Sequence, residues 1–331
     1  MKMKRLKVVP LVLSAVLAFS LAACGSGSNE ASQSSSSTAA IASSTTSAAS
    51  EASDTGKNYK VFLITMDQMD QYWAGIDEGC KRAVAELGNV DYKWTAPDVK
   101  DDSKQIEMIN NAVANGANAI LVAANGPDAI TSALKEADSK GVKVVYVDSP
   151  ANFPALATLA TNNEAAGKTA GEEMLKDLAA AGANSGKIGI ISVNAATAST
   201  VAREKGFRSA FDGKEYTLLE TQYCDGDAAK SKDAASNYIT QGIVGIFGAN
   251  EGSAVGAGNA IKESGKPIVG IGFDNSDSIT GLLADGFLKA TMVQNPSVMG
   301  YDGIKIAVGV LSGAAKGDGS VKDTGVSVVT K

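Results

Sequence analysis

The feature that most constrains the fold is a repeated alternation of short β-rich segments and amphipathic segments, which begins at Tyr59. This alternation is typical of β-α-β units, in which helices connect parallel strands and cover the sheet. Two series of five strands are predicted, at residues 59–65, 91–95, 119–123, 142–148 and 157–161 and at residues 187–193, 216–223, 245–248, 267–273 and 288–294. Between strands, Ile106, Ile109 and Val113 have the helical spacing that places an apolar stripe against a sheet. The sequence predicts an α/β fold of two doubly wound, Rossmann-like lobes with parallel sheets.

The N-terminal residues have a different composition and are predicted to precede the fold. Basic residues come before an apolar run at residues 8–22, as in a signal peptide, and the run is short for a membrane-spanning helix. It ends in Leu21-Ala22-Ala23-Cys24, which resembles the lipobox of bacterial lipoproteins. The resemblance implies that residues 1–23 are removed and that a lipidated Cys24 anchors the chain to the cell membrane on its extracytoplasmic side; a plain secretory signal is the alternative. Residues 24–57, mostly Ser, Ala, Thr and Gly, are predicted to form a flexible tether.

Composition argues against several classes of function. The chain has 30 Lys and Arg against 36 Asp and Glu, a net charge of -6, so its surface is not built to neutralise nucleic-acid phosphates. It contains no His, the usual general base and the commonest transition-metal ligand. The cysteines Cys24, Cys80 and Cys224 form neither a disulfide framework nor a paired metal motif. We therefore predict no nucleic-acid binding, no metal, no cofactor and no catalytic residues.

Polar and aromatic side chains cluster where the predicted strands end. Ligands of open α/β sheets bind beyond the carboxyl ends of the strands. Carboxylates, amides and a guanidinium can each form paired hydrogen bonds, and aromatic rings can cover the apolar face of a sugar. The pattern is typical of a polyol-binding site. The residues after the predicted strands include Asp67, Gln68, Asp70, Tyr72, Trp73, Asn125, Asp148, Ser149, Arg203, Asn250, Glu251, Asp274, Asn275 and Gln294.

Each of these residues also has a purely structural interpretation, which the sequence leaves open. Asp148, Asn250 and Asp274 could be helix N-caps. Tyr72 and Trp73 could be core residues at the start of a helix. Similarly, the Arg203 side chain could be a solvated charge on a helix surface.

Several segments together are similar to one known family. They are Asp70-Gln71-Tyr72-Trp73, Val147-Asp148, Ala165-Ala166-Gly167-Lys168, Arg203 with Gly206-Phe207, Phe247-Gly248-Ala249-Asn250-Glu251, Val269-Gly270-Ile271-Gly272-Phe273-Asp274, and Gln294. With them, the span from Tyr59 to Lys331 resembles the periplasmic-binding-protein type I fold, in particular the ribose-binding-protein-like receptors of sugar ABC transporters.

This resemblance implies two lobes, joined by a three-strand hinge, that close on a ligand. Residues 58–161 plus 295–323 would form the N-terminal lobe, and residues 162–294 plus 324–331 the C-terminal lobe. The implied ligand is a pentose or hexose monosaccharide, and the implied partners are an ABC permease and its ATPase, with the receptor itself a monomer. The ligand-binding residues predicted in this way are Asp70, Tyr72, Trp73, Asn125, Asp148, Arg203, Asn250, Asp274 and Gln294.

Four positions depart from the ribose receptors. Asp70 and Ala123 stand where those receptors usually have Asn, Ser149 where they have Arg, and Gly226 where they have an aromatic residue. These departures leave the identity of the sugar open, and Asn125 is predicted to replace the missing amide from a shifted loop. Two alternatives remain: a signalling receptor of the same fold for a ligand such as autoinducer-2, and a glycan-modifying enzyme that uses paired acids such as Asp67 and Asp70.

Overall fold

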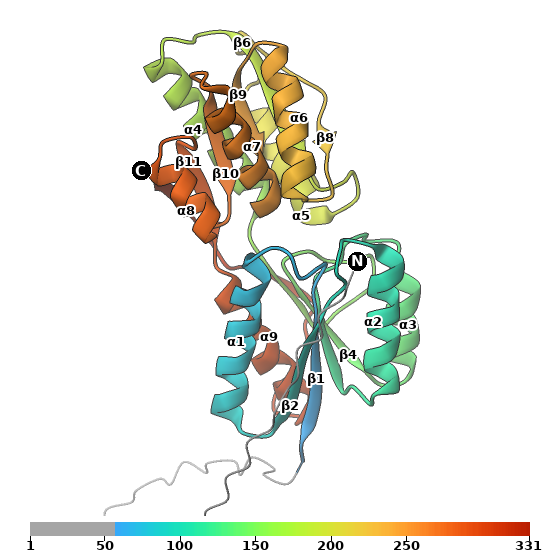
Figure 1. Cartoon of the computed structure of the whole chain (residues 1–331). Coiled ribbons are helices and arrows are strands. Elements are labelled where there is room, and N and C mark those ends of the chain that lie inside the picture. Colours follow the sequence, from blue (N-terminus) through green and yellow to red (C-terminus); the bar gives the residue numbers. More distant parts are fainter. Residues whose placement is uncertain (1–56) are drawn as a thin grey trace, which may run out of the picture. The chain divides into compact units, whose positions relative to one another are not determined.

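The computed structural model describes residues 57–331, which form two α/β lobes (Figure 1). The predicted signal peptide, the lipidated Cys24 and nearly all of the predicted tether lie outside the described residues. Within residues 57–331, no helix is both long and apolar enough to span a membrane.

The first lobe is built on a parallel sheet of six strands. The order across the sheet is β12-β5-β4-β3-β1-β2. The strands are β1 (Tyr59–Ile64), β2 (Val90–Thr95), β3 (Ala119–Val122), β4 (Lys143–Val147), β5 (Ala157–Ala160) and β12 (Ser320–Asp323). Helices α1 (Tyr72–Leu87) and α9 (Pro296–Leu311) cover one face, and α2 (Asp102–Ala114) and α3 (Thr131–Ser139) cover the other (Figure 1).

Side-chain alternation along the strands explains why both faces of this sheet are covered. Val61 and Leu63 of β1 pack towards α1 and α9, while Phe62 and Ile64 pack towards α2 and α3. Successive side chains of a strand point to opposite faces, so a strand that is apolar throughout must be buried on both sides.

The second lobe contains a seven-stranded sheet. The order is β13-β11-β10-β9-β6-β7, and β8 also pairs with β6. The strands are β6 (Gly186–Ser192), β7 (Tyr216–Leu218), β8 (Gln222–Tyr223), β9 (Ile243–Gly248), β10 (Val269–Phe273), β11 (Ala290–Gln294) and β13 (Val326–Thr330). Helices α4 (Asn163–Ala180) and α5 (Ala198–Ser209) cover one face, α6 (Ala228–Thr240) and α7 (Glu251–Ser264) the other, and α8 (Asp277–Ala284) packs beside α7.

The last two strands differ from the sequence prediction of two parallel sheets of about five strands. Strand β12 adds a parallel strand to the first sheet, whereas β13 pairs with β11 in the antiparallel direction. Both are short and largely exposed, so they lack the buried apolar pattern on which the other strands were predicted. The predicted strand at 216–223 is divided into β7 and β8, which both pair with β6.

The chain crosses between the sheets three times, after β5, after β11 and between β12 and β13. The crossovers are hydrogen-bonded to one another. The Thr161 hydroxyl donates to Gln294 Oε1 at 2.8 Å, and the Asn295 amide donates to the Thr324 carbonyl at 2.7 Å. A hinge of three linked strands therefore connects the lobes.

Close packing of α5 on α4 fixes the position of Arg203. A Cβ atom on Gly206 would lie 1.9 Å from the Glu164 carbonyl oxygen, and one on Gly167 would lie 2.0 Å from the Arg203 carbonyl oxygen. Because glycine occupies both positions, the two helix backbones approach closely and α5 carries Arg203 to the interface between the lobes.

Candidate functional site

One interlobe cavity lies where the carboxyl ends of the strands of both lobes meet. It contains eight of the nine predicted ligand-binding residues, all except Asn125. The lining residues are Met66, Asp70, Tyr72, Trp73, Lys100, Asp148, Val193, Thr197, Ser199, Thr200, Arg203, Asn250, Asp274 and Gln294. The free volume is about 20 Å³, which is room for about one water molecule. A ligand the size of a ring can therefore enter this cavity only when the lobes separate.

Two aspartates of the cavity follow strands directly and have left-handed backbones. Asp148 follows β4 with φ of 62°, and Asp274 follows β10 with φ of 74°. Asp tolerates this conformation better than most residues, and such strain is often found at functional sites. Neither residue is the N-cap of a described helix: Asp148 is followed by the strand β5, and α8 is capped by Ser276. Both carboxylates instead lie at the cavity.

Arg203 is buried between the lobes rather than solvated, with 2% of the residue exposed. Its guanidinium lies 3.9 Å from the centre of the Phe273 ring. Its nitrogens donate to Asn163 Oδ1 at 2.7 Å, to the Ala249 carbonyl at 3.0 Å and to Gln294 Oε1 at 2.9 Å. Its Nη2 lies 3.6 Å from Asp148 Oδ1. The guanidinium thus connects the hinge residue Gln294 to a carboxylate of the opposite lobe.

Tyr72 and Trp73 belong both to the core and to the cavity wall. Both are buried, and their rings meet edge to face with centroids 5.0 Å apart. The Tyr72 hydroxyl donates to Asp148 Oδ1 at 3.0 Å. Trp73 Nε1 is buried with no hydrogen-bond partner among the described residues. Buried N–H groups are nearly always paired, so this unpaired donor is unusual.

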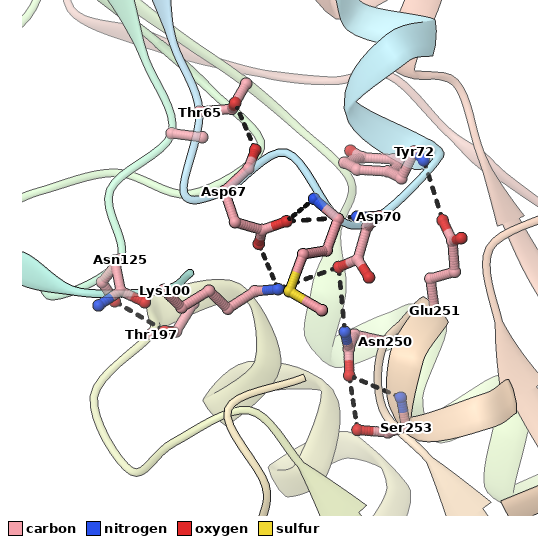
Figure 2. A network of polar contacts seen from close by, with 12 residues as sticks. Thr65, Asp67, Asp70, Tyr72, Lys100, Asn125, Thr197, Asn250, Glu251 and Ser253 are labelled. Carbon is pink, nitrogen blue, oxygen red and sulfur yellow. Dashed lines mark hydrogen bonds and ion pairs between the residues drawn. The ribbon is translucent and has the colours of Figure 1, made fainter. Parts of the chain in front are cut away.

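Asn250 combines a structural and an interlobe contact. Its Oδ1 accepts from the Ser253 backbone N–H at 3.3 Å. Asn250 is therefore the N-cap of α7, which was the structural interpretation of this residue. Its Nδ2 donates to Asp70 Oδ2 at 3.3 Å in the first lobe (Figure 2). An amide can make both contacts because it has an acceptor and a donor.

Lys100, which the sequence reasoning did not identify, lies at the centre of this contact. Its ammonium forms ion pairs with Asp67 and, at 3.1 Å, with Asp70, and only 4% of its side chain is exposed (Figure 2). It also approaches the second lobe, since a Cβ on Gly226 would lie 2.8 Å from Lys100 Nζ. Lys100 follows β2, so the rule that ligand residues follow strands could have found it.

Asn125 is at the interface between the lobes but does not line the cavity. Its side chain donates to Asp102 Oδ1 at 2.6 Å, and its carbonyl accepts from the Thr197 hydroxyl at 2.7 Å. The loop after β3 therefore contacts the second lobe without presenting an amide to the cavity. In this arrangement the Asn125 amide bonds to Asp102, and its expected role as a replacement amide stays a prediction.

Burial dominates the electrostatics of the cavity. It raises the pKa of Asp274 to about 7, against the opposing effect of the Arg203 guanidinium. Burial likewise raises the pKa of Asp70 to about 6 and raises that of Asp148. For Lys100, burial acts to lower the pKa, but the two neighbouring carboxylates outweigh it and the pKa is raised. Asp274 and Asp70 therefore take up a proton at a higher pH than an exposed aspartate does, while Lys100 stays charged.

The raised pKa of Asp274 predicts a pH dependence of stability. An unfolded Asp has a pKa near 3.8, so between pH 7 and pH 4 the folded chain holds a proton that the unfolded chain releases. The free energy of unfolding should rise as pH falls through this window, by about 3 kcal/mol between pH 8 and pH 5 from this residue alone. Denaturant unfolding of the parent chain and of Asp274→Asn across this range measures it. A stability difference between the two chains that does not change with pH would contradict the assignment.

The described residues provide no built metal centre and no activated thiol. Within residues 57–331, no group of three or more His, Cys, Asp or Glu side chains is placed to hold a metal ion. Cys80 and Cys224 are buried free thiols, and burial raises the pKa of both, that of Cys80 to about 12.

Known proteins resemble this chain in sequence and in fold. A family model described as periplasmic binding protein domain matches residues 61–315. The ribose import binding protein of Haemophilus influenzae is 27% identical over 246 residues, which cover 73% of this chain and 82% of that protein. The D-allose-binding periplasmic protein of Escherichia coli is 26% identical, covering 76% and 83% of the two chains.

Solved structures are similar over a larger share of the chain. A carbohydrate transporter solute binding protein from Agrobacterium radiobacter, in complex with D-arabinose, has a TM-score of 0.78 and 31% identity, covering 83% of this chain and 95% of that one. An ABC transporter solute binding protein from Agrobacterium vitis, with bound D-fucose, has a TM-score of 0.77 and 30% identity, covering 82% and 95% of the two chains.

Proposed function

Because the chain belongs to the periplasmic binding protein domain family, we propose that its interlobe cavity captures a monosaccharide, a pentose or a hexose, for an ABC importer. The single observation that supports this most strongly is that Asp148, Arg203 and Asp274 converge with the buried aromatic pair on one cavity. The relatives named above are sugar-binding proteins, and none of them is described as a signalling receptor or a glycan-modifying enzyme.

The mechanism is a shift between open and closed lobes rather than a chemical reaction. The residues of the cavity come from both lobes, so a sugar contacts all of them only in the closed form. A ligand stabilises the closed form by the difference between its affinities for the two forms. Carboxylates and amides accept and donate to sugar hydroxyls, and Tyr72 and Trp73 provide the apolar surface.

The finer site assignment is part of the same proposal. Asp70, Tyr72, Trp73, Asp148, Arg203, Asn250, Asp274 and Gln294 are the residues that contact the sugar. Lys100 belongs to the same proposed set. This chain has Gly226 where ribose receptors have an aromatic residue, and the Lys100 ammonium lies next to that position. This exchange favours a polar edge of the ligand at that end of the cavity.

The proposed partners and location are supported by the N-terminal sequence and by the family. The chain is a monomer that is anchored to the extracytoplasmic face of the cell membrane by lipidated Cys24, and it delivers sugar to a permease driven by an ATPase. Lipidation is tested by comparing the membrane fraction of the full-length chain with that of Cys24→Ser, which should be released from the membrane.

A sugar panel tests the proposed function. The full-length chain, unfolded and refolded to remove any ligand, is heated in the presence of D-ribose, D-allose, D-arabinose, D-fucose or autoinducer-2. A sugar present at a hundred times its dissociation constant stabilises the folded chain by about 2.7 kcal/mol, which raises Tm by roughly 5 °C. A shift with one of the four sugars supports the proposal. A shift with autoinducer-2 alone, or with none of the compounds, contradicts it.

A further inference from the structure

The N-terminus of α1 is completed by the opposite lobe. The first N–H groups of a helix have no partner within the helix. Here the Trp73 and Ala74 N–H groups bond to the carbonyls of Asp70 and Gln71, at 3.3 and 3.0 Å. Among the described residues, the N-cap Gln71 makes no side-chain cap, and the first turn of α1 has no acidic residue. The N–H groups of Gln71 and Tyr72 therefore need acceptors from elsewhere.

Glu251 of the second lobe supplies both acceptors. Its Oε1 accepts from the Gln71 N–H at 3.1 Å. Its Oε2 accepts from the Tyr72 N–H at 2.9 Å (Figure 2). Glu251 is buried, with 8% of the residue exposed. A carboxylate at a helix N-terminus also interacts favourably with the helix dipole, and hydrogen bonds to a charged acceptor are stronger than neutral ones.

A side chain of the first lobe likewise provides an acceptor for the N-terminus of a helix in the second lobe. The Gln71 side-chain Oε1 accepts from the Asp277 N–H at 3.2 Å, at the start of α8 in the second lobe. Each lobe thus provides a side-chain acceptor for the N-terminus of a helix in the other lobe. When the lobes separate, the two caps are broken together, because Gln71 takes part in both.

The two caps are formed by the same short segments that line the cavity. Gln71 lies between Asp70 and Tyr72, and Glu251 follows Asn250. Neither lines the cavity described above, but Gln71 lines a neighbouring pocket that shares Tyr72, Asp274 and Gln294 with it. The backbone N–H of Glu251 also donates to Asp274 Oδ2 at 3.1 Å. Any movement that brings the cavity residues together therefore forms the caps as well.

We propose that Glu251 and Gln71 are positioning residues whose reciprocal helix caps set the fraction of closed molecules and the rate at which ligand leaves. The caps contribute to closure whether or not a ligand is bound. The effect on ligand release rests on the proposed sugar-binding function, whereas the effect on closure of the sugar-free chain does not.

Amide hydrogen exchange of the sugar-free, full-length chain tests the proposal. Glu251→Ala removes the cap on α1 and should speed exchange at Gln71 and Tyr72. It should also speed exchange at Asp277, which Glu251 does not contact, because the second cap opens with the first. Glu251→Gln keeps one acceptor oxygen, now neutral, and should speed exchange at the same amides by a smaller factor. This variant keeps the test available if Glu251→Ala folds poorly. Glu263→Ala removes an acidic residue of the same helix that pairs with Lys232 within the second lobe, so it should leave all three amides unchanged.

Exchange that increases at Gln71 and Tyr72 but not at Asp277 would overturn the proposal, because the two caps would then be independent. With D-ribose as the probe, Glu251→Ala should also release the sugar roughly tenfold faster than the parent chain, with an association rate that changes little. Unchanged release would likewise overturn it. If the parent chain does not bind D-ribose, it is the choice of sugar or the proposed function that fails, and the exchange experiment still decides the role of the caps.

Discussion

Replacing Arg203 with methionine is expected to lower the free energy of unfolding by about 3–5 kcal/mol, because it leaves buried charge without its counter-charge. The Arg203 Nη2 atom lies 3.6 Å from Asp148 Oδ1. The guanidinium lowers the pKa of both Asp148 and Asp274, which partly offsets the rise in pKa that burial causes. The substitution also removes the donors to Asn163 and Gln294. Urea unfolding of the purified chain measures the loss.

The same variant should bind sugar at least about thirtyfold more weakly, since truncating one partner of a buried, hydrogen-bonded charge pair costs about 2 kcal/mol or more. Lys205→Met is the matched control, because Lys205 lies on the same helix and makes an exposed ion pair with Glu164. Exposed pairs contribute about 0–1 kcal/mol, so this control should be nearly neutral. If Arg203→Met is as stable as Lys205→Met and binds sugar as well as the parent chain, the structural role assigned to Arg203 is wrong.

Replacing Lys100 with methionine should lower the free energy of unfolding by a similar amount and for the same reason, the loss of a buried cation. Lys100 is the cation between the carboxylates of Asp67 and Asp70, and all three side chains are buried or nearly so. Without it, two neighbouring carboxylates are left in the closed interface, and breaking a buried ion pair in this way typically costs about 3–5 kcal/mol. Thermal or urea unfolding measures the loss of stability.

A second substitution separates the charge of Lys100 from its packing. Asp67→Asn on the Lys100→Met background removes one of the two unpaired charges and should recover part of the lost stability. Lys104→Met is the matched control, since Lys104 belongs to the same part of the chain and forms an exposed pair with Asp98. If the second substitution recovers nothing, the loss comes from packing and the electrostatic account fails.

The sequence predicted the architecture well because the buried strands are apolar throughout and alternate with amphipathic helices. The strands up to β11 lie close to their predicted bounds. Strands β12 and β13 were missed because Ser320–Asp323 and Val326–Thr330 are short and exposed, and they are held by pairing with residues far away in the sequence. Pairing over such distances leaves no local hydrophobic pattern.

The residues of the candidate site differ in how directly the sequence pattern indicates them. Asp148 and Asp274 directly follow buried parallel strands. Ligands bind beyond the carboxyl ends of such strands, so the strand pattern alone predicts where these two residues lie. Lys100 follows the edge strand β2 and was overlooked, although the same rule applies to it. The contact of Glu251 with the start of α1 spans about 180 residues of sequence and depends on the relative position of the two lobes. No local pattern can reveal that contact.

The most direct test of the central claim is a crystal structure of the chain with the sugar from the panel that gives the largest thermal shift. We expect one sugar ring between the lobes, with hydroxyls bonded to Asp148 and Asp274 and with Tyr72 or Trp73 against an apolar face of the ring. A ring bound outside the interlobe cavity, or bound there without contact to either aspartate, would contradict the account.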